Sequence, residues 1–432
     1  MRGRWPKIYA LGLKRACYKP HIVTAPKYPA RPGNSMASPS SLPHRKTCLQ
    51  VVPSLVTGGV ERGTVDVAQA LVQAGWRALV VSSGGPMVRE LERVGAEHIV
   101  LPLDTKNPRT VRRNVDSLAA LMRAEQVDLV HGRSRAPAWS AKQACIQTGT
   151  PFVTTFHGVY GLGFFGLKKL YNRVMAQGEI VIAISEFIRD HLITEYKVDP
   201  ARIRVIHRGV DVKLLDPNSV TPTRLIQLTS KWRLPEAASV IMLPGRLTSW
   251  KGHDVLIDAL AELKRRRGGA LDIRCLMVGQ DQGRVAYRAH IERYARDQGV
   301  DGNVQIIDDC NDLPAAYMAT DVVVSASTRP EAFGRVVAEG QAMGRPVVAP
   351  SHGAAEEIII PGVTGWLFTP GDGVSLADAL ERALSLTQTE RIRLADAAIT
   401  RARALFAKAD MCAKTLLVYE EILARAPGQA AS

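Results

Sequence analysis

Two carboxylates with a spacing that could serve chemistry, Glu331 and Glu339, stand in the stretch RPEAFGRVVAEGQAMGRPVV (residues 329–348). A pair of carboxyl groups can hydrolyse a glycoside when the two lie about 5–9.5 Å apart. Eight residues of continuous helix would separate this pair by roughly 12 Å. The spacing therefore favours two groups that accept hydrogen bonds from different hydroxyls of one polyol. The alternative is two solvated charges beside a helix start.

The residues around this pair predict where it lies in a fold. The order is a strand (DVVVSAS, from Asp321), a loop, a helix, a tight turn and a second strand. Glu331 is thus expected at the carboxyl end of a strand, with Glu339 one or two turns into the helix. Ligands of open α/β sheets bind at that edge. Phe333 and Gly334 follow Glu331, and the glycine lets backbone N–H groups come close to a ligand.

A second loop, GRLTSWKGHD (245–254), places Arg246 and Lys251 at a helix entrance. Backbone N–H groups and the helix dipole favour a phosphate there. An Arg fork and a Lys point charge add to this attraction. The pattern is typical of a site for a diphosphate that gains charge as it leaves, although two solvated cations on a surface turn are the alternative.

The first half carries weaker signals at equivalent places. SLVTGGVER (54–62) has Gly58 and Gly59, which allow the backbone to approach a sugar or a phosphate. It lacks the G-x-G-x-x-G pattern and so argues against a nicotinamide enzyme. His157, in the run TTFHG (154–158), is expected at the end of a strand, where it either hydrogen-bonds a sugar or polarises the acceptor, or is a satisfied core or loop residue. SRAPAWSA (134–141) is a basic, aromatic loop that could meet an acceptor.

One segment suggests a membrane contact. Phe164, Phe165 and Leu167 precede three cations, Lys168, Lys169 and Arg173. Apolar tips backed by cations suit an anionic membrane surface, and ordinary packing on the domain is the equal alternative. The sequence contains neither D-x-D nor H-E-x-x-H, so a metal-bridged diphosphate is not indicated and no metal is expected.

Composition limits the class of protein. A chain of 432 residues is expected to form two domains. Its six cysteines are scattered without zinc spacing, which indicates thiols in a reducing compartment. No apolar run approaches the ~20 residues of a membrane span.

The net charge of +15 lies in the first half: residues 1–60 hold ten Lys or Arg and no acid, and residues 61–211 hold 20 basic and 15 acidic residues. This asymmetry predicts an anionic partner for one domain only. The candidates are an anionic membrane surface, a phosphorylated or acidic acceptor, or a nucleic acid. The nucleic acid is the least favoured, because no RNA- or DNA-recognition motif accompanies the charge.

Short β-branched runs alternate with helical patterns in both halves, which predicts two parallel-sheet α/β domains. Seven runs are expected before Asp211 and five after residue 232. We expect a basic segment at 1–46, which is either a disordered tail or a start upstream of the true initiator at Met36. The expected order then continues with a domain at 47–211, a linker at 212–232, a domain at 233–388 and closing helices at 389–432.

Together these motifs resemble the retaining glycosyltransferases of the GT-B fold, family four. The resemblance covers about residues 48–425 and rests on E-x7-E at 331–339, GRLTSWKG, TGGVE, AISEFIRDHL and IHRGVD. More narrowly, it is similar to bacterial lipopolysaccharide-core mannosyltransferases. Two segments depart from the family pattern: His352-Gly353-Ala354-Ala355 precedes Glu356, and IIDDCNDLP (306–314) lacks the usual glycine, so the nucleobase is not readable.

The resemblance implies two Rossmann-like domains facing each other across a cleft, with a nucleotide sugar, GDP-mannose or a UDP-sugar, as donor. It implies that Arg246 and Lys251 hold the diphosphate, that Glu331, Phe333 and Gly334 bind the sugar, and that Glu339 binds the ribose. His157 would lie beside the transferred sugar, and Gly58 and Gly59 near the donor. The transferred hexose, with mannose favoured, would pass with retention to an anionic glycan or glycolipid such as lipopolysaccharide core. No cofactor and no metal are implied.

The enzyme is expected in the cytoplasm, with the inner face of the cytoplasmic membrane as an alternative place. The rival hypotheses are a nucleotide-sugar epimerase or a phosphorylase on the same fold, and a non-catalytic adaptor that binds anions.

Overall fold

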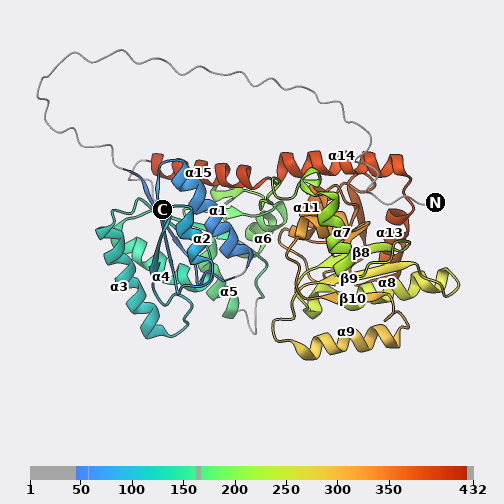
Figure 1. The fold of residues 1–432 in the computed structure, drawn as a ribbon. Helices are drawn as coiled ribbons and strands as arrows, with labels where there is room; N and C mark the ends of the chain where they lie inside the picture. Colours follow the sequence, from blue (N-terminus) through green and yellow to red (C-terminus); the bar gives the residue numbers. More distant parts are fainter. Residues whose placement is uncertain (1–44, 57, 162–166, 426–432) are drawn as a thin grey trace, which may run out of the picture. The chain divides into compact units, whose positions relative to one another are not determined.

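The structure is a computed structural model that describes residues 45–56, 58–161 and 167–425. Nearly all of the expected basic segment at 1–46, and the aromatic tip at Phe164 and Phe165, lie outside these residues. The described chain contains two parallel sheets with helices around them, as the alternating pattern predicts (Figure 1).

The first sheet has seven parallel strands in the order β3-β2-β1-β4-β5-β6-β7. Its strands are short apolar runs, mostly buried on both faces, as is usual when helices cover a parallel sheet. They are β1 (Thr47–Val51), β2 (Arg77–Ser82), β3 (Glu97–Val100), β4 (Leu129–Gly132), β5 (Phe152–Phe156), β6 (Ile180–Ala183) and β7 (Ile203–Val205).

Helices connect these strands. The first, α1, begins at Gly59 and ends before Gly75, whose positive φ of +82° suits a helix end. The helices of this half are α1 (Gly59–Gln73), α2 (Val88–Arg93), α3 (Pro108–Ala124), α4 (Arg135–Thr148), α5 (Leu167–Asn172) and α6 (Glu186–Tyr196).

The second sheet has six parallel strands in the order β10-β9-β8-β11-β12-β13. They are β8 (Ser239–Pro244), β9 (Ile273–Val278), β10 (Val304–Ile307), β11 (Val322–Val324), β12 (Val347–Pro350) and β13 (Gly365–Phe368). The sequence predicted five strands here and missed β13. That strand has four residues and stands between the turn residues Pro361-Gly362 and Pro370-Gly371, so its pattern resembles a loop. The accompanying helices are α8 (His253–Arg266), α9 (Val285–Asp297), α10 (Leu313–Met318), α11 (Arg335–Ala342), α12 (Ala355–Ile358) and α13 (Gly373–Leu384).

The segment 212–232, expected to be a linker with weak periodicity, contains helix α7 (Pro222–Lys231). Thr221 caps this helix by accepting from Arg224 N, and Pro222 occupies its first turn. Leu228 and Trp232 are buried, and α7 packs against α10. The Pro and Thr residues of this segment, which resemble loop signals, are thus the start signals of a helix.

The strand order of each sheet reverses once, and this reversal decides where a ligand can bind. Successive strands are added on one side of β1 and then, from β4 on, on its other side; in the second sheet the same change occurs between β8 and β11. Parallel α/β sheets bind ligands at the carboxyl ends of strands beside such a switch point. The loops that follow these four strands are therefore the first places to look for a site.

The last two helices pack on different halves. Helix α14 (Gln388–Leu405) packs against α11, whereas α15 (Lys408–Ala424) packs against α1 (Figure 1). Buried residues of α15 include Cys412, Val418, Tyr419 and Ile422, which join the core of the first half. Among the described residues, no helix is both long and apolar enough to cross a membrane.

Candidate active site

The loops after β8 and β11 lie against each other at the switch point of the second sheet. Thr328 N donates to Trp250 O at 2.8 Å, which joins the two loops. Gly252 has a φ of +71°, and a Cβ there would lie 1.8 Å from Ala326 O. Only glycine allows this approach, because a side chain would overlap a backbone carbonyl. The glycine therefore fixes the loop that carries Lys251.

Lys251 and Glu331, which are 80 residues apart in the sequence, meet at this point. Lys251 Nζ donates to Glu331 Oε1 at 2.7 Å, and the two side chains are 13% and 18% exposed. The ammonium also lies 4.5 Å from the ring centroid of Trp250. Two predicted site residues from different loops thus form one partly buried ion pair at the sheet edge where ligands are expected.

Further groups hold Glu331 in place. Ser327 Oγ donates to the same carboxylate oxygen, and Ser325 Oγ lies 3.4 Å from it. Ala354 N donates to Glu331 O at 3.0 Å. Ser185, which caps α6, donates through Oγ to Ala332 O at 2.6 Å. The loop of Glu331 is therefore held by residues of both halves of the chain.

Glu339 lies within α11 and is buried, with 6% of its surface exposed. Its Oε2 accepts from Tyr317 OH at 2.8 Å, and its Oε1 pairs with Arg335 at 2.7 Å. Burial, followed by the charge of Glu339, raises the pKa of Tyr317 well above its usual value, so the phenol stays a donor. Gly334 begins this helix with a φ of +74°. Glu339 is therefore oriented by two donors and does not behave as a solvated surface charge.

Two other predicted residues of the second half differ in exposure. Arg246 is exposed, so a ligand can reach it from solvent. The ring of Phe333 is buried against Phe406, with centroids 5.6 Å apart, and lies 6.4 Å from the ring of His207. The Phe333 ring is thus packed in the core and is not available to a ligand.

His157 follows β5 in the first half and contacts Arg208, which follows β7. Arg208 Nη1 lies 3.0 Å from His157 Nδ1, and a guanidinium can only donate. Nδ1 must then accept, so the ring proton is on Nε2, which is buried and has no partner. Burial, followed by the charge of Arg208, holds the pKa of His157 well below its usual value. His157 is therefore a neutral donor.

The loop of Gly58 and Gly59 lies close to Arg208. Gly58 is extended, Gly59 begins α1, and a Cβ on Gly59 would lie 3.3 Å from Arg208 Nη2. The second glycine thus allows the guanidinium to approach the first turn of the helix.

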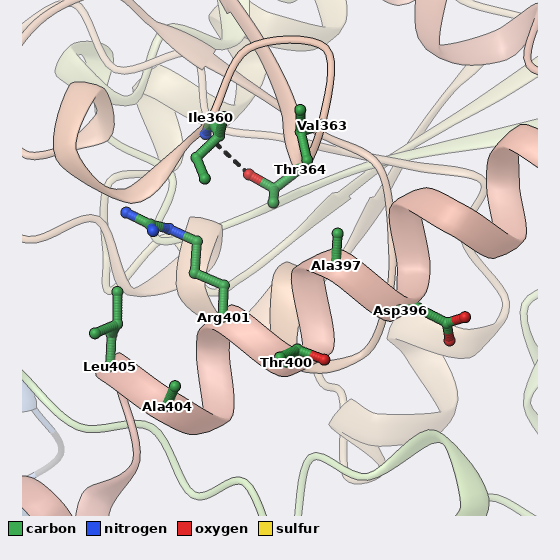
Figure 2. A pocket seen from close by; sticks show the side chains of 9 residues that line it. All are labelled: Ile360, Val363, Thr364, Asp396, Ala397, Thr400, Arg401, Ala404 and Leu405. Carbon is green, nitrogen blue, oxygen red and sulfur yellow. Dashed lines mark hydrogen bonds between the residues drawn. The ribbon is translucent and has the colours of Figure 1, made fainter.

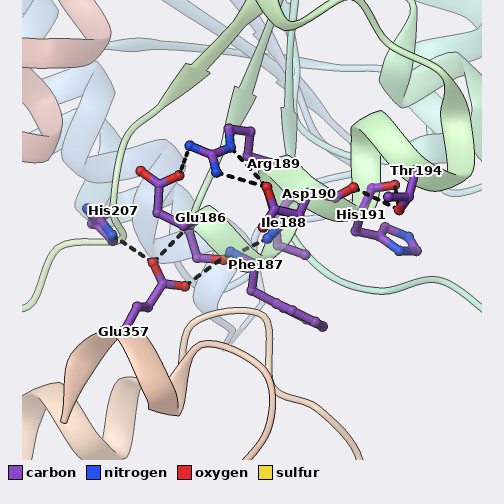
Figure 3. A network of polar contacts seen from close by, with 10 residues as sticks. Glu186, Phe187, Ile188, Arg189, Asp190, His191, Thr194, His207 and Glu357 are labelled. Carbon is purple, nitrogen blue, oxygen red and sulfur yellow. Dashed lines mark hydrogen bonds and ion pairs between the residues drawn. The ribbon is translucent and has the colours of Figure 1, made fainter. Parts of the chain in front are cut away.

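A network around Glu357 links α6 to α12 (Figure 3). The carboxylate accepts from Glu186 N at 2.9 Å and Phe187 N at 3.3 Å, and it pairs with His207 Nε2 at 3.1 Å. A carboxylate at the start of a helix is favourable because of the unpaired N–H groups there. The AISEFIRDHL segment, which contains the start of α6, thus supplies a contact between the halves.

The structure groups the predicted residues into two sets. Lys251 and Glu331 are in direct contact, and His157 shares Arg208 with Gly59, whereas no direct contact joins Glu339 to Glu331 among the described residues. Sequence reasoning missed Arg208 and Ser327. The signal for Arg208 was its position in IHRGVD, directly after the last strand of the first sheet.

A cavity of about 520 Å³ is lined by residues other than the site residues named above (Figure 2). It is lined by α14 and the 360–364 turn, and within it Ile360 N donates to Thr364 Oγ1 at 2.9 Å. Its lining is mainly apolar and includes none of the predicted site residues, so size alone does not identify the active site here.

Both halves of the chain match family models of known proteins. Residues 57–214 match the family model of Glycosyltransferase Family 4, and residues 238–386 match that of Glycosyl transferases group 1. The crystal structure of a glycosyltransferase from Rickettsia africae ESF-5 is similar, with 38% identity and a TM-score of 0.82 over 88% of this chain and 100% of that one.

Two further relatives are more distant. A D-inositol 3-phosphate glycosyltransferase from Salinispora tropica is 29% identical over 396 residues, covering 81% of this chain and 80% of its own. HepE from Anabaena, solved with UDP-glucose, is 23% identical with a TM-score of 0.75 over 87% of this chain and 99% of that one, and shows the fold alone. The chain spans between 49% and 80% of the length of curated relatives it matches. The two parallel-sheet α/β domains have the GT-B fold.

Proposed function

The chain belongs to the group 1 glycosyltransferases, and we propose that it is a retaining, metal-independent enzyme that transfers a hexose from a nucleotide sugar. The observation that supports this site best is the 2.7 Å pair of Lys251 and Glu331 at the switch point of the second sheet. It brings a cation for phosphate and a carboxylate for hydroxyls together at the edge where ligands of such sheets bind.

Each predicted residue has a role that fits its environment. Lys251, with the exposed Arg246, would hold the donor diphosphate, and Glu331 with the backbone of Phe333 and Gly334 would hold the sugar. Glu339, fixed by its two donors, would accept from the ribose hydroxyls. On the first sheet, Gly58 and Gly59 would face the donor from the start of α1.

We propose a front-face transfer. The acceptor oxygen forms a bond to the anomeric carbon on the face from which the diphosphate leaves. The bond between that carbon and the diphosphate oxygen breaks with its electron pair, and the acceptor proton moves to the diphosphate. The products are a glycoside of retained configuration and a nucleoside diphosphate. Donors aimed at the developing charge of the leaving group lower the barrier.

His157 is not the general base of this scheme. Its Nδ1 is occupied by Arg208, and its neutral ring presents only the Nε2 proton. We propose that this N–H donates to a hydroxyl of the donor sugar. The leaving diphosphate itself then takes the acceptor proton.

The sugar and the acceptor are finer proposals. The sequence resemblance favours mannose and an anionic acceptor such as lipopolysaccharide core, and the basic first half suits an anionic glycan or membrane surface. HepE was solved with UDP-glucose, and the relative from Salinispora tropica is named a D-inositol 3-phosphate glycosyltransferase, a name that includes a phosphorylated compound. GDP-mannose and UDP-sugars are therefore both donors to test.

The test is a panel of nucleotide sugars offered to the full chain. We expect one donor to raise the melting temperature and to be hydrolysed slowly to its nucleoside diphosphate, with no loss of rate in EDTA. The sugar released should keep its anomeric configuration. A panel in which no donor is bound or hydrolysed would overturn the proposal.

The same panel separates the rivals. An epimerase would convert the donor sugar without releasing nucleoside diphosphate, and a phosphorylase would require free phosphate. A non-catalytic adaptor would bind polyanions with a steep salt dependence and hydrolyse no donor.

A further inference from the structure

Arg208, in the loop after β7, is a buried cation that faces a cavity. Only 8% of its surface is exposed, and its Nη1 donates to His157 Nδ1. The cavity it lines has a volume of about 270 Å³ and also contains Gly63 and Glu339. Small-molecule sites usually begin at about 300 Å³, so this space suits a substrate group better than a whole nucleotide sugar.

The other cations of this cavity are matched by carboxylates. Arg62 pairs with Glu90, Arg335 with Glu339 at 2.7 Å, and Lys408 with Asp211 at 2.7 Å and Asp66 at 3.6 Å. Within the described part of the chain, no carboxylate lies within ion-pair distance of Arg208.

A second buried cation, Arg133, lies beside it. Arg133 follows β4 at the switch point of the first sheet, where its N–H donates to Val51 O of β1 at 3.1 Å. It is 4% exposed, its Nη1 donates to Gln50 Oε1 at 3.2 Å, and its buried Nε has no partner.

Gly63 of α1 shows how close the two guanidinium groups are. A Cβ at Gly63 would lie 2.9 Å from Arg133 Nη2 and 3.1 Å from Arg208 Nη2. Both terminal nitrogens therefore converge on the same point beneath α1.

Two converging cations are unfavourable in the free protein. Removing an ion from water is unfavourable unless an opposite charge compensates for it. Burial, followed by Arg133 and Arg335, lowers the pKa of Arg208 to about 9, although Asp66 and Glu61 act in the opposite direction from beyond ion-pair distance. A bound anion would compensate for both charges.

We propose that Arg208 and Arg133 form a second oxyanion subsite, which takes a phosphate group of a substrate. A guanidinium fork matches phosphate oxygens in bidentate geometry, and two forks suit a group with more than one negative charge. The phosphate belongs either to the donor diphosphate or to a phosphorylated acceptor. The subsite rests on the proposed transferase function and is distinct from Arg246 and Lys251, which lie in the loop after β8 of the second sheet.

Binding experiments without turnover test this subsite separately from the activity. Full-length protein is titrated calorimetrically with pyrophosphate, and with inorganic phosphate in the presence of saturating UDP or GDP. In Arg208→Met we expect pyrophosphate binding to weaken at least tenfold if the donor supplies the phosphate. If the acceptor supplies it, only phosphate binding beside the nucleotide weakens. Arg112→Met, on the exposed side of α3, is the matched control.

Stability gives a readout that a purely structural arginine would not give. Removing one of two repelling buried cations should leave the melting temperature of the ligand-free protein unchanged or higher. In pyrophosphate or phosphate the wild type should become the more stable protein. Gly63→Ala, which favours the helix, should also weaken anion binding, because its Cβ displaces both guanidinium groups.

Two results would overturn the subsite. One is unchanged binding of both probes in Arg208→Met and Gly63→Ala. The other is a large loss of stability of Arg208→Met in the absence of anions, which would make Arg208 structural. Donor turnover in the wild type with either result would leave the transferase function standing without this subsite.

Discussion

Replacing Lys251 by methionine tests the ion pair on which the proposed donor site depends. The change keeps an unbranched side chain but removes the ammonium that lies 2.7 Å from Glu331 Oε1. Negative charge develops on a departing diphosphate, and one donor aimed at such charge contributes on the order of 10²–10³ in kcat. We expect kcat to fall by that factor, which is roughly 2.7–4 kcal/mol of transition-state stabilisation.

The same change should cost much less folding stability. Glu331 would keep Ser327 and Ser325 as donors, so its carboxylate is not left without partners. A hydrogen bond to a charged group contributes about 1.5–3 kcal/mol, and the partial exposure of this pair lowers that figure. We expect the free energy of unfolding to fall by no more than about 2 kcal/mol.

The assay follows release of nucleoside diphosphate from the best donor of the panel, with melting temperature measured on the same samples. Lys231→Met, at the exposed end of α7, is the matched control and should retain full turnover. Glu331→Gln should lose kcat as well, and the double variant should lose less than the two single losses combined, because the residues act as one unit. Near-normal turnover in Lys251→Met, or unfolding of that variant, would refute the reasoning.

Three further outcomes follow from the described contacts. Burial, then the charge of Arg133, holds the pKa of His131 well below 6.5, so below that pH the unfolded chain binds a proton that the folded chain does not. The free energy of unfolding should therefore fall by about 1.4 kcal/mol per pH unit below 6.5. Urea unfolding at pH 7.5 and at pH 5 should show a smaller loss in His131→Gln than in the wild type. Gly252→Ala should lower both melting temperature and turnover, since its Cβ overlaps Ala326 O, whereas Gly268→Ala, with a similar φ of +68° and open space, should cost only the ~1–2 kcal/mol of a left-handed backbone. Glu357→Ala should lower the free energy of unfolding by about 0.5–2 kcal/mol in denaturant titrations, because α6 loses the carboxylate at its start; an unchanged value would show that water replaces it.

Much of the fold could be predicted from the sequence because parallel strands buried on both faces are short apolar runs of β-branched residues. Twelve of the strands in the two sheets come from such runs. β13 and α7 could not be predicted in this way. Their local residues, Gly and Pro around one and Pro and Thr before the other, resemble loop signals, and only packing against neighbours decides their conformation.

The residues of the candidate site could be proposed from the sequence, but the contacts between them could not. Lys251 and Glu331 stood out because each follows an apolar strand and carries a charge near a glycine. Their contact depends on β8 and β11 being neighbours in the sheet, which no local pattern states. Arg133 and Arg208 were missed for a related reason: their burial comes from α1, whose Gly63 leaves room for both guanidinium groups.

The pairing of Tyr419 with His131, at 2.6 Å and across 288 residues, has a consequence for how the chain is made. α15 completes the core of the first half but leaves the ribosome only after the whole second half has been translated. The first half is thus completed only after the second half, and part of its apolar surface stays uncovered while the second half is translated. Nascent chains stalled before residue 408 should expose this surface to chaperones, and the segment 47–211 expressed without α15 should aggregate.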